Sequence, residues 1–429
     1  MRTVYVSSIL VLIILTLTLP VNGSIFRLTL NGPIDTIAEE YITNSYKKID
    51  KDPESELIII EIDTPGGFST SMRTIIKEIM NSRVPTAVYV SPRGARAASA
   101  GFLITISSNI AVMAPGTNMG AAHPVAIMGK EVSKTMNEKI TNDAVSYVKS
   151  LAKSKKRNIE LAAKAVKESK SYTAEECLKG NLIDLIADNI EDLIKKIKGK
   201  KILLSDGSEF ILSIKDPSVI KIEMSGRQKF LRTITNPNLA YFLLIIGLIG
   251  LYIEFTHPGA IIPGVLGGIS LLLAFMAFQV LPLNYVGLMM ILLSVGFFIA
   301  EVKIQGFGIF GIGGILSFAL GSIILINAPI PEMRPAMATI ISVTVCFGII
   351  LLFLAYKVIK AMNRKTETGQ EGIVGETGKA LTPINPDSGK VFVHGEIWKA
   401  CSDVNIPQGK KIEVISIKNL ILKVIQRGG

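Results

Sequence analysis

The feature of this sequence that most limits its fold is a long segment with almost no charge. Between Arg232 and Lys357 only five side chains are charged, far too few for a soluble domain of that length. An apolar helix of about 20 residues crosses the hydrocarbon of a bilayer and satisfies its own backbone there. We therefore predict a membrane region of about five helices over 237–360. The predicted spans cover residues 239–256, 261–281, 284–301, 306–327 and 337–357.

The composition of the whole chain agrees with a membrane protein. Hydrophobic residues make up 49% and charged residues 19%, which excludes a disordered chain and an ordinary soluble enzyme. The net charge of +11 fits basic loops beside membrane lipid, a generic basic surface or nucleic-acid binding. The three cysteines are far apart in the sequence, so we expect no disulfide framework, no metal site and no cofactor.

The two ends of the chain predict its orientation in the membrane. Residues 1–23 are typical of a signal peptide, with an uncleaved anchor as the alternative. Basic residues over 357–365 follow the last span, and by the positive-inside rule that end is cytoplasmic. With five spans, residues 24–230 lie outside the cytoplasm; four or six spans would place both soluble parts on one side. We expect a multi-pass protein of the cell membrane.

Residues 24–230 return to soluble composition and alternate between strand and helix patterns. This alternation, with strands that are apolar on both faces, predicts an α/β domain with a parallel sheet. The expected strands are 25–30, 56–63, 86–90 and 110–113, and the expected helices are 35–49, 67–80, 97–106, 134–155, 158–168 and 173–179.

The last segment, 369–429, predicts a small all-β barrel of the OB type. Its expected strands are 373–374, 379–381, 391–393, 412–416 and 420–425. Only Phe392 and Trp398 are available there for stacking on bases. We therefore expect no nucleic acid and favour a module that binds a protein partner.

Two short motifs carry chemistry. A strand ends in Thr64-Pro65-Gly66-Gly67 before a helix, which is a favourable place for backbone N–H groups to bind an anion. The next strand is followed by 94–101, a run of small residues that includes Ser99. Small neighbours let a substrate backbone approach the hydroxyl, and the Ala100 amide is available for an oxyanion. Taken singly, each motif also fits an ordinary turn or helix start.

The pair of motifs resembles the ClpP/crotonase superfamily of serine peptidases. The resemblance covers about 25–200 and extends to the segments 118–124 and 173–184. It implies an α/β fold built as a spiral of ββα units. Together with the spans and the terminal barrel, the whole chain is similar to the long-form NfeD proteins, which are membrane-bound serine proteases.

The resemblance also implies the site residues. Ser99 is the nucleophile, and the amides of Gly67 and Ala100 form the oxyanion hole. His123 stands where ClpP has its histidine, but Ser169 stands where ClpP has the aspartate that orients it. Long-form NfeD proteases are similar instead to signal peptide peptidases, which use a Ser-Lys dyad.

The lysine of this dyad matches Lys139, at the start of the long helix. A lysine acts as a base only in its neutral form, and desolvation favours that form by lowering the pKa of the side chain. Lys134 and His123 remain alternatives, and Lys130 is a further candidate in the same segment.

By this resemblance the chain is an ATP-independent serine endopeptidase that cleaves exposed apolar segments. The family suggests a stomatin-type membrane protein as substrate and a homo-oligomer as the working state. No G-x-x-x-x-G-K-[ST] loop occurs in the sequence. One alternative is an inactive scaffold whose barrel binds the partner, and another is an acyl-CoA enzyme of the crotonase type. Transport is disfavoured because Glu254 and Glu301 fall at the ends of predicted spans.

Overall fold

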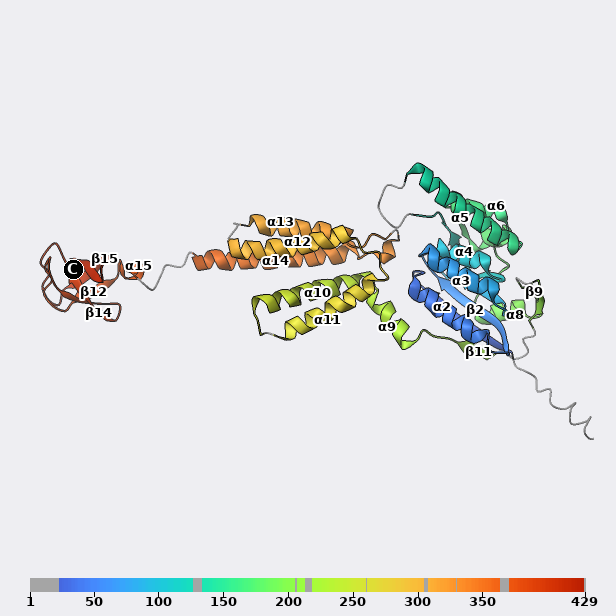
Figure 1. Ribbon diagram of the computed structural model, residues 1–429, viewed down its shortest axis with the longest axis horizontal. Helices are drawn as coiled ribbons and strands as arrows, with labels where there is room; N and C mark the ends of the chain where they lie inside the picture. The colour runs from blue at the N-terminus through green and yellow to red at the C-terminus, as the bar shows by residue number, and fades with distance from the viewer. Residues whose placement is uncertain are drawn as a thin grey trace, which may run out of the picture. The chain divides into compact units, whose positions relative to one another are not determined.

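The computed structural model describes most of the chain in two compact units, Met1–Thr344 and Val345–Gly429 (Figure 1). The described residues are 23–125, 133–204, 207–212, 218–259, 261–304, 308–328, 330–362 and 370–427. The predicted signal peptide, apart from Gly23, and Lys130 lie outside them.

A six-stranded parallel sheet forms the centre of the N-terminal domain. Its order is β11-β1-β2-β3-β5-β8, and every neighbouring pair is parallel. The strands are β1 (Ser24–Asn31), β2 (Ser55–Asp63), β3 (Thr86–Val90), β5 (Ile110–Met113), β8 (Leu185–Ile186) and β11 (Ser218–Lys221). Every residue of β3 and β5 is buried, as expected for strands covered on both faces. The predicted α/β domain with a parallel sheet is therefore present.

A second, three-stranded sheet lies beside the first and carries the motifs of interest. It consists of β4 (Arg96–Ala98), β6 (Asn118–Gly120) and β7 (Ser171–Thr173), in that order. Strand β4 follows β3 and precedes helix α4 (Ala100–Ser107), so the unit strand, strand, helix recurs along the chain. The predicted helix 97–106 was therefore wrong at its start, because 96–98 pair with 118–120 before the helix begins.

Helices cover the main sheet, and their ends follow the capping residues. Asp35 caps α2 (Thr36–Ile49) by accepting from two backbone N–H groups, and Asn158 caps α6 (Ile159–Lys167) in the same way. Helix α4 is buried along its whole length, whereas α5 (Lys134–Ser154) buries only residues of its second half. The others are α3 (Ser69–Asn81), α7 (Ala174–Lys179) and α8 (Ile190–Ile197), and a hairpin of β9 (Lys201–Leu203) and β10 (Glu209–Ile211) follows α8.

Five apolar helices follow α9 (Gly226–Ile234), and their positions agree with the predicted spans. They are α10 (Pro237–Thr256), α11 (Ile262–Phe278), α12 (Tyr285–Ile304), α13 (Ile309–Ile324) and α14 (Met337–Met362). Helix α10 packs on α11, and α12 packs on α13. Two described segments, Pro237–Thr256 and Pro331–Ile350, are long and apolar enough to cross a membrane, and three shorter apolar helices accompany them.

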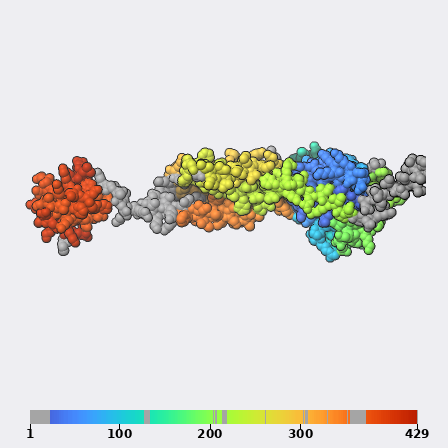
Figure 2. All heavy atoms as spheres, turned by 90° about the horizontal axis from the view of Figure 1, so that it is seen from below, coloured from blue at the N-terminus to red at the C-terminus, as the bar shows by residue number. Residues whose placement is uncertain are grey.

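The C-terminal unit contains a closed five-stranded barrel, which Figure 2 shows as a compact body. Its order is β12-β13-β14-β16-β15, with strands β12 (Thr377–Ala380), β13 (Lys390–Val393), β14 (Glu396–Cys401), β15 (Lys411–Lys418) and β16 (Ile421–Gln426). The small β-barrel is thus present, but one strand was mispredicted. Residue Ile373 belongs to helix α15 (Gln370–Ile373), and β14 was missed. Strand β14 follows a two-residue turn in which His394 and Gly395 both have positive φ, as hairpin turns require.

Candidate functional site

Ser99 lies at a strained point of the backbone between β4 and α4. Its φ of 51° and ψ of −113° are a conformation that side-chain-bearing residues rarely adopt, at a cost of about 1–3 kcal/mol. The Ser99 N–H donates to the Gly120 carbonyl at 2.8 Å, which fixes this turn against β6. The side chain is partly exposed. A strained turn that presents a hydroxyl at a helix N-terminus points to a functional role.

The Thr64–Gly67 turn lies directly against Ser99. A Cβ atom on Gly66 would be 2.7 Å from Ser99 Cβ and 3.1 Å from Ser99 Oγ, and Gly66 has a φ of +116°. Only glycine fits such a position without strain or collision. Thr64 joins the turn to β4, because its N–H donates to the Arg96 carbonyl and its own carbonyl accepts from the Ala98 N–H. The two motifs paired by the sequence analysis therefore meet.

Two backbone N–H groups belong to the residues that directly follow Ser99 and Gly66, namely Ala100 and Gly67. Ala100 is the first residue of α4, so its N–H has no carbonyl partner inside the helix. At the other motif, Ile34 binds the Gly66 carbonyl and the Phe68 N–H, at 2.9 and 2.8 Å. Because Gly66 and Phe68 make both hydrogen bonds of the bridge between Ile34 and Gly67, the Gly67 N–H takes no part in that bridge. This arrangement can hold an oxyanion next to a nucleophile.

The lysine candidates lie on the exposed half of α5. Lys139 and Lys134 are both exposed, and the only residues that α5 buries are farther along it, from Val148 onward. The middle of the helix is held by Arg73, which pairs with Asp143 at 2.6 Å and lies over a tyrosine ring. No described contact joins Lys139 or Lys134 to Ser99.

His123 lies three residues after the Gly120 carbonyl that binds Ser99. Its Nδ1 is 3.1 Å from the carbonyl of Val166, at the end of α6. A carbonyl can only accept, so Nδ1 carries the proton in this contact and Nε2 is left as an acceptor. Ser169, which the sequence analysis matched with the ClpP aspartate, has a positive φ of 55°. In this structure a backbone carbonyl orients the His123 ring.

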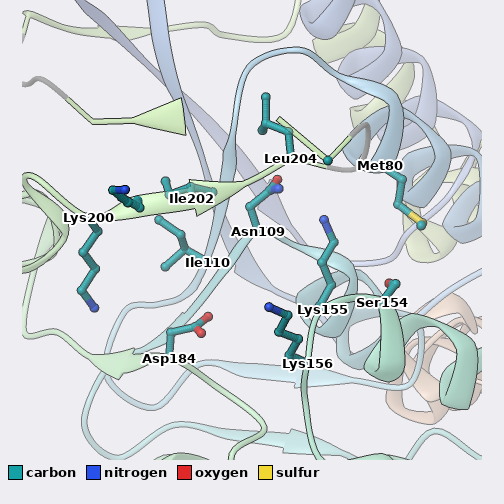
Figure 3. Close-up of a pocket in the computed structure, with 12 residues that line it drawn as sticks. Met80, Asn109, Ile110, Ser154, Lys155, Lys156, Asp184, Lys200, Ile202 and Leu204 are labelled. Atoms are coloured by element: carbon teal, nitrogen blue, oxygen red, sulfur yellow. The ribbon is translucent and has the colours of Figure 1, made fainter. Parts of the chain in front are cut away.

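A second serine and lysine lie together in a cavity of about 370 Å³ (Figure 3). Burial, and then the nearby Arg157 charge, lower the pKa of Lys155 to about 8. The neighbouring Ser154, however, donates its hydroxyl to the Leu151 carbonyl at 2.8 Å. The lining residues are Met80, Asn109, Ile110, Ser154, Lys155, Lys156, Asp184, Lys200, Lys201, Ile202, Leu204 and Gly207. This cavity was not found from the sequence, because the burial of Lys155 depends on packing.

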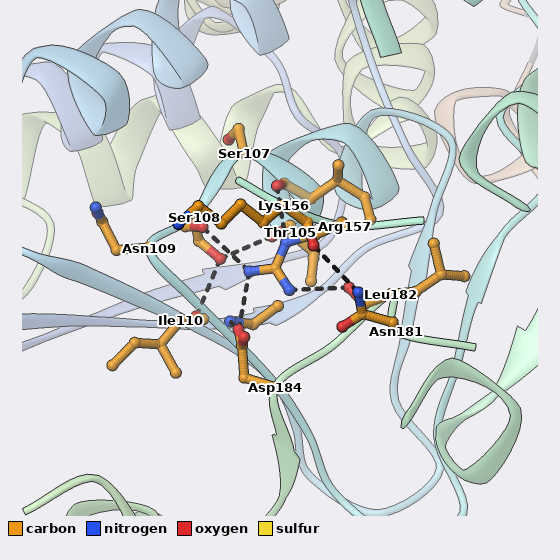
Figure 4. A network of polar contacts seen from close by, with 12 residues as sticks. Thr105, Ser107, Ser108, Asn109, Ile110, Lys156, Arg157, Asn181, Leu182 and Asp184 are labelled. Atoms are coloured by element: carbon orange, nitrogen blue, oxygen red, sulfur yellow. Dashed lines mark hydrogen bonds and ion pairs between the residues drawn. The ribbon is translucent and has the colours of Figure 1, made fainter. Parts of the chain in front are cut away.

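Arg157, beside this cavity, closes the far end of α4 (Figure 4). Its buried guanidinium donates to the carbonyls of Ile106, Ser108 and Leu182 at 3.1–3.2 Å and to Asp184 at 2.9 Å. The carbonyls at a helix C-terminus lack hydrogen-bond donors within the helix, and here Arg157 supplies N–H donors to them. The helix that begins beside Ser99 is therefore fixed at its other end.

The described residues include no cluster of three histidine, cysteine or acidic side chains able to hold a metal ion. Cys177 is buried, and burial raises the pKa of its thiol to about 12, which makes it a poor nucleophile.

Sequence reasoning missed Gly66, Gly120 and Ile34 as parts of the Ser99 site. The Pro-Gly-Gly motif was a signal for Gly66, while the other two contacts are made by distant segments.

Comparison with known proteins gives matches along nearly the whole chain. Three family profiles match: the NfeD1b N-terminal domain over 24–198, the NfeD integral membrane domain over 238–357, and the NfeD-like C-terminal, partner-binding domain over 370–424. The membrane-bound protease PH1510 of Pyrococcus horikoshii is 34% identical, over 98% of this chain and 97% of its own length. The membrane protein NfeD1b of Bacillus subtilis is 26% identical, over 86% of this chain and 85% of its own.

Among solved structures, the chain is similar to the 1510-N membrane-bound stomatin-specific protease, in a lysine-to-alanine variant bound to a substrate peptide. The identity is 32%, the match covers 50% of this chain and 98% of that one, and the TM-score is 0.46. The 1510-N protease specific for a stomatin homologue from Pyrococcus horikoshii matches at 31% identity, over 50% of this chain and 98% of that one, with a TM-score of 0.43.

Proposed function

We propose, from the premise that this chain belongs to the NfeD family, that it is an integral-membrane, ATP-independent serine endopeptidase. Its substrates are proteins with exposed apolar segments, among them a stomatin-type membrane partner. In this proposal residues 1–23 are a signal peptide and 24–230 a ClpP/crotonase-like protease domain outside the cytoplasm. Residues 237–360 form five spans, and 369–429 form an OB-like barrel in the cytoplasm.

One observation carries the proposal: the strained Ser99 turn is packed against Gly66 and has two backbone N–H groups beside it. A structural serine at a helix start does not need a positive φ, since serine caps helices in extended conformations. Here the strained serine is partly exposed, and in the proposal the Gly67 and Ala100 amides are the oxyanion donors. Acyl transfer requires a nucleophile and oxyanion donors in this relation.

The mechanism follows from these groups. Neutral Lys139 accepts the proton of Ser99, whose Oγ attacks the peptide carbonyl, and the N–H groups of Gly67 and Ala100 hold the resulting oxyanion. The Lys139 ammonium then gives its proton to the leaving amine, and an acyl-Ser99 ester remains. Lys139 next takes a proton from water, which attacks the ester through a second oxyanion, and Lys139 returns that proton to Ser99 Oγ as the acid product leaves.

Lys139 must be desolvated for this mechanism, because only the neutral amine accepts a proton. The exposed half of α5 that carries it also exposes Met136 and Ile140, with 51% and 37% of their surface accessible. An apolar substrate segment or a second copy of the chain, covering this half of α5, would desolvate Lys139. We therefore include a homo-oligomer in the proposal.

The match to an NfeD-like partner-binding domain favours one alternative, a membrane scaffold without activity. In that case the barrel at 370–427 would recruit the partner, and the N-terminal domain would keep the protease fold without its activity. The two functions differ in one respect: cleavage of the partner requires Ser99, whereas binding of the partner by a scaffold does not.

The test is hydrolysis of a quenched apolar peptide by the full chain in lipid nanodiscs. We expect Ser99→Ala and Lys139→Ala to remove turnover, while His123→Ala and the matched control Lys134→Ala retain it. An inert parent that is folded and oligomeric would contradict the peptidase proposal and favour the scaffold. Loss of activity in His123→Ala with survival of Lys139→Ala would instead assign the base to the histidine.

A further inference from the structure

Helix α9, just before the first apolar helix, is fastened to the start of the N-terminal domain (Figure 1). Arg227 pairs with Glu40 of α2 at 2.8 and 3.1 Å, and Gln228 donates to the same carboxylate at 3.2 Å. One turn farther along, Arg232 contacts a different target, the loop between β1 and α2. Of these two sets of contacts, only that of Arg232 reaches the loop between β1 and α2.

Arg232 holds the loop at three points. Its guanidinium donates to the Asn31 carbonyl at 2.7 Å, to the Pro33 carbonyl at 3.2 Å and to Asp35 Oδ2 at 2.8 Å. The pair is largely removed from water, with 24% of the Arg232 side chain and 7% of the Asp35 side chain exposed. A Cβ on Gly32 would lie 2.9 Å from the guanidinium, so the loop backbone is closely packed against it.

The residue inside this loop is Ile34, which binds the turn at Gly67. Ile34 is fully buried, and its N–H and carbonyl bind the Gly66 carbonyl and the Phe68 N–H. A Cβ on Gly67 would lie 2.1 Å from the Ile34 carbonyl oxygen, so the two backbones are in direct contact. A shift of the Ile34 backbone must therefore move the Gly67 N–H.

We propose that Arg232 is a positioning residue for the oxyanion-binding turn: by clamping 31–35 it fixes Ile34 and, through Ile34, the Gly67 N–H. This inference rests on the proposed peptidase function. It makes the helix that leads into the membrane region part of the support of the candidate active site.

The geometry favours arginine at this position over other cations. Its planar fork reaches two carbonyls and a carboxylate at once, whereas a lysine ammonium is a compact charge on a flexible stem. The neighbouring Arg227–Glu40 pair is more exposed, at 67% and 38%, and touches no residue of the loop. Arg227 is therefore a matched control on the same helix.

The experiment compares the full chain in lipid nanodiscs with Arg232→Ala, Arg232→Gln, Arg232→Lys and Arg227→Ala, measuring kcat and KM for the quenched apolar peptide. A misplaced oxyanion donor acts in the transition state, so kcat falls about 10- to 100-fold in Arg232→Ala and Arg232→Gln while KM changes less than about twofold. Arg232→Lys recovers part of kcat, and Arg227→Ala retains it. Equal kcat values in Arg232→Ala and Arg227→Ala would overturn the proposal.

Hydrogen exchange of the same proteins separates this inference from the peptidase function. In the Arg232 variants, the peptides that contain the Ile34 and Phe68 amides exchange faster, while those from β3 and β5 do not. An inert parent would contradict the peptidase function, and unchanged exchange at these two amides would then overturn the clamp as well. Faster exchange throughout the domain would show general destabilisation and would also overturn it.

Discussion

Two regions of the N-terminal domain each hold a serine and a candidate lysine, and they differ in what packing does to each group. At Ser99 the serine is strained, partly exposed and packed against Gly66, but Lys139 is exposed on α5. In the cavity, Lys155 is desolvated and its pKa is lowered to about 8, but Ser154 is a relaxed helical residue whose hydroxyl is already bonded.

The comparison teaches that a lysine with a lowered pKa does not by itself make a dyad. Acyl transfer also needs a presented nucleophile and preorganised oxyanion donors. A lysine on an exposed helix can lose its water later, when a substrate or a second copy covers it. We therefore propose that Ser99 carries the chemistry and that the Lys155 cavity is a structural feature.

The largest expected effect in this comparison is a loss of kcat when Gly66 is substituted. In Gly66→Ala the new Cβ would meet Ser99 Cβ at 2.7 Å, and the displaced serine should lower kcat about 100-fold. Gly94→Ala is the matched control, since Gly94 also has a positive φ, +84°, but nothing lies within 4 Å of its added Cβ. Steady-state peptide hydrolysis by both variants checks this. Equal kcat values in the two would argue that Ser99 tolerates displacement.

The next effect concerns stability, because Arg157 ties the end of α4 to the region of Lys155. Arg157→Ala leaves three carbonyls without this donor and Asp184 with the Ala111 N–H alone, which should lower the free energy of unfolding by roughly 3–5 kcal/mol. The control is Arg93→Ala, which breaks an exposed pair with Asp188 and should cost less than about 1 kcal/mol. Denaturant unfolding of the detergent-solubilised chain measures both, and similar losses would refute the role of the network.

The smallest effect is a pH dependence from Lys155. Its pKa is about 8 in the folded protein and near the ordinary 10.5 when unfolded, so the unfolded state binds more protons between these values. Lys155 therefore makes the free energy of unfolding rise as the pH increases from about 8 to about 10.5. In Lys155→Met this rise should be reduced, while peptide hydrolysis is retained. A loss of turnover in this variant would move the base to the cavity.

Much of the fold could be predicted from local patterns. The strands at 86–90 and 110–113 have the predicted bounds because each is a short apolar run between turn signals. Strand β4 could not be predicted, since it exists only through pairing with a segment about twenty residues later. Strand β14 was missed although His394-Gly395 was a usable hairpin signal.

The candidate site, like the fold, could be predicted from the sequence only in part. Ser99 and the Pro-Gly-Gly turn were recognisable because small residues and glycines mark close backbone approach. The contact of Ile34 with Gly67 and the reach of Arg232 to 31–35 join segments far apart in the sequence. No spacing or periodicity encodes such contacts, so only the folded structure shows them.

The most direct test of the Ser99 assignment is to treat the full chain in nanodiscs with a fluorophosphonate and to locate the adduct by mass spectrometry. The account predicts a covalent adduct on the peptide that contains Ser99, none on the peptide that contains Ser154, and loss of peptide hydrolysis in proportion to labelling. An adduct on Ser154, or full inhibition with Ser99 unmodified, would contradict it.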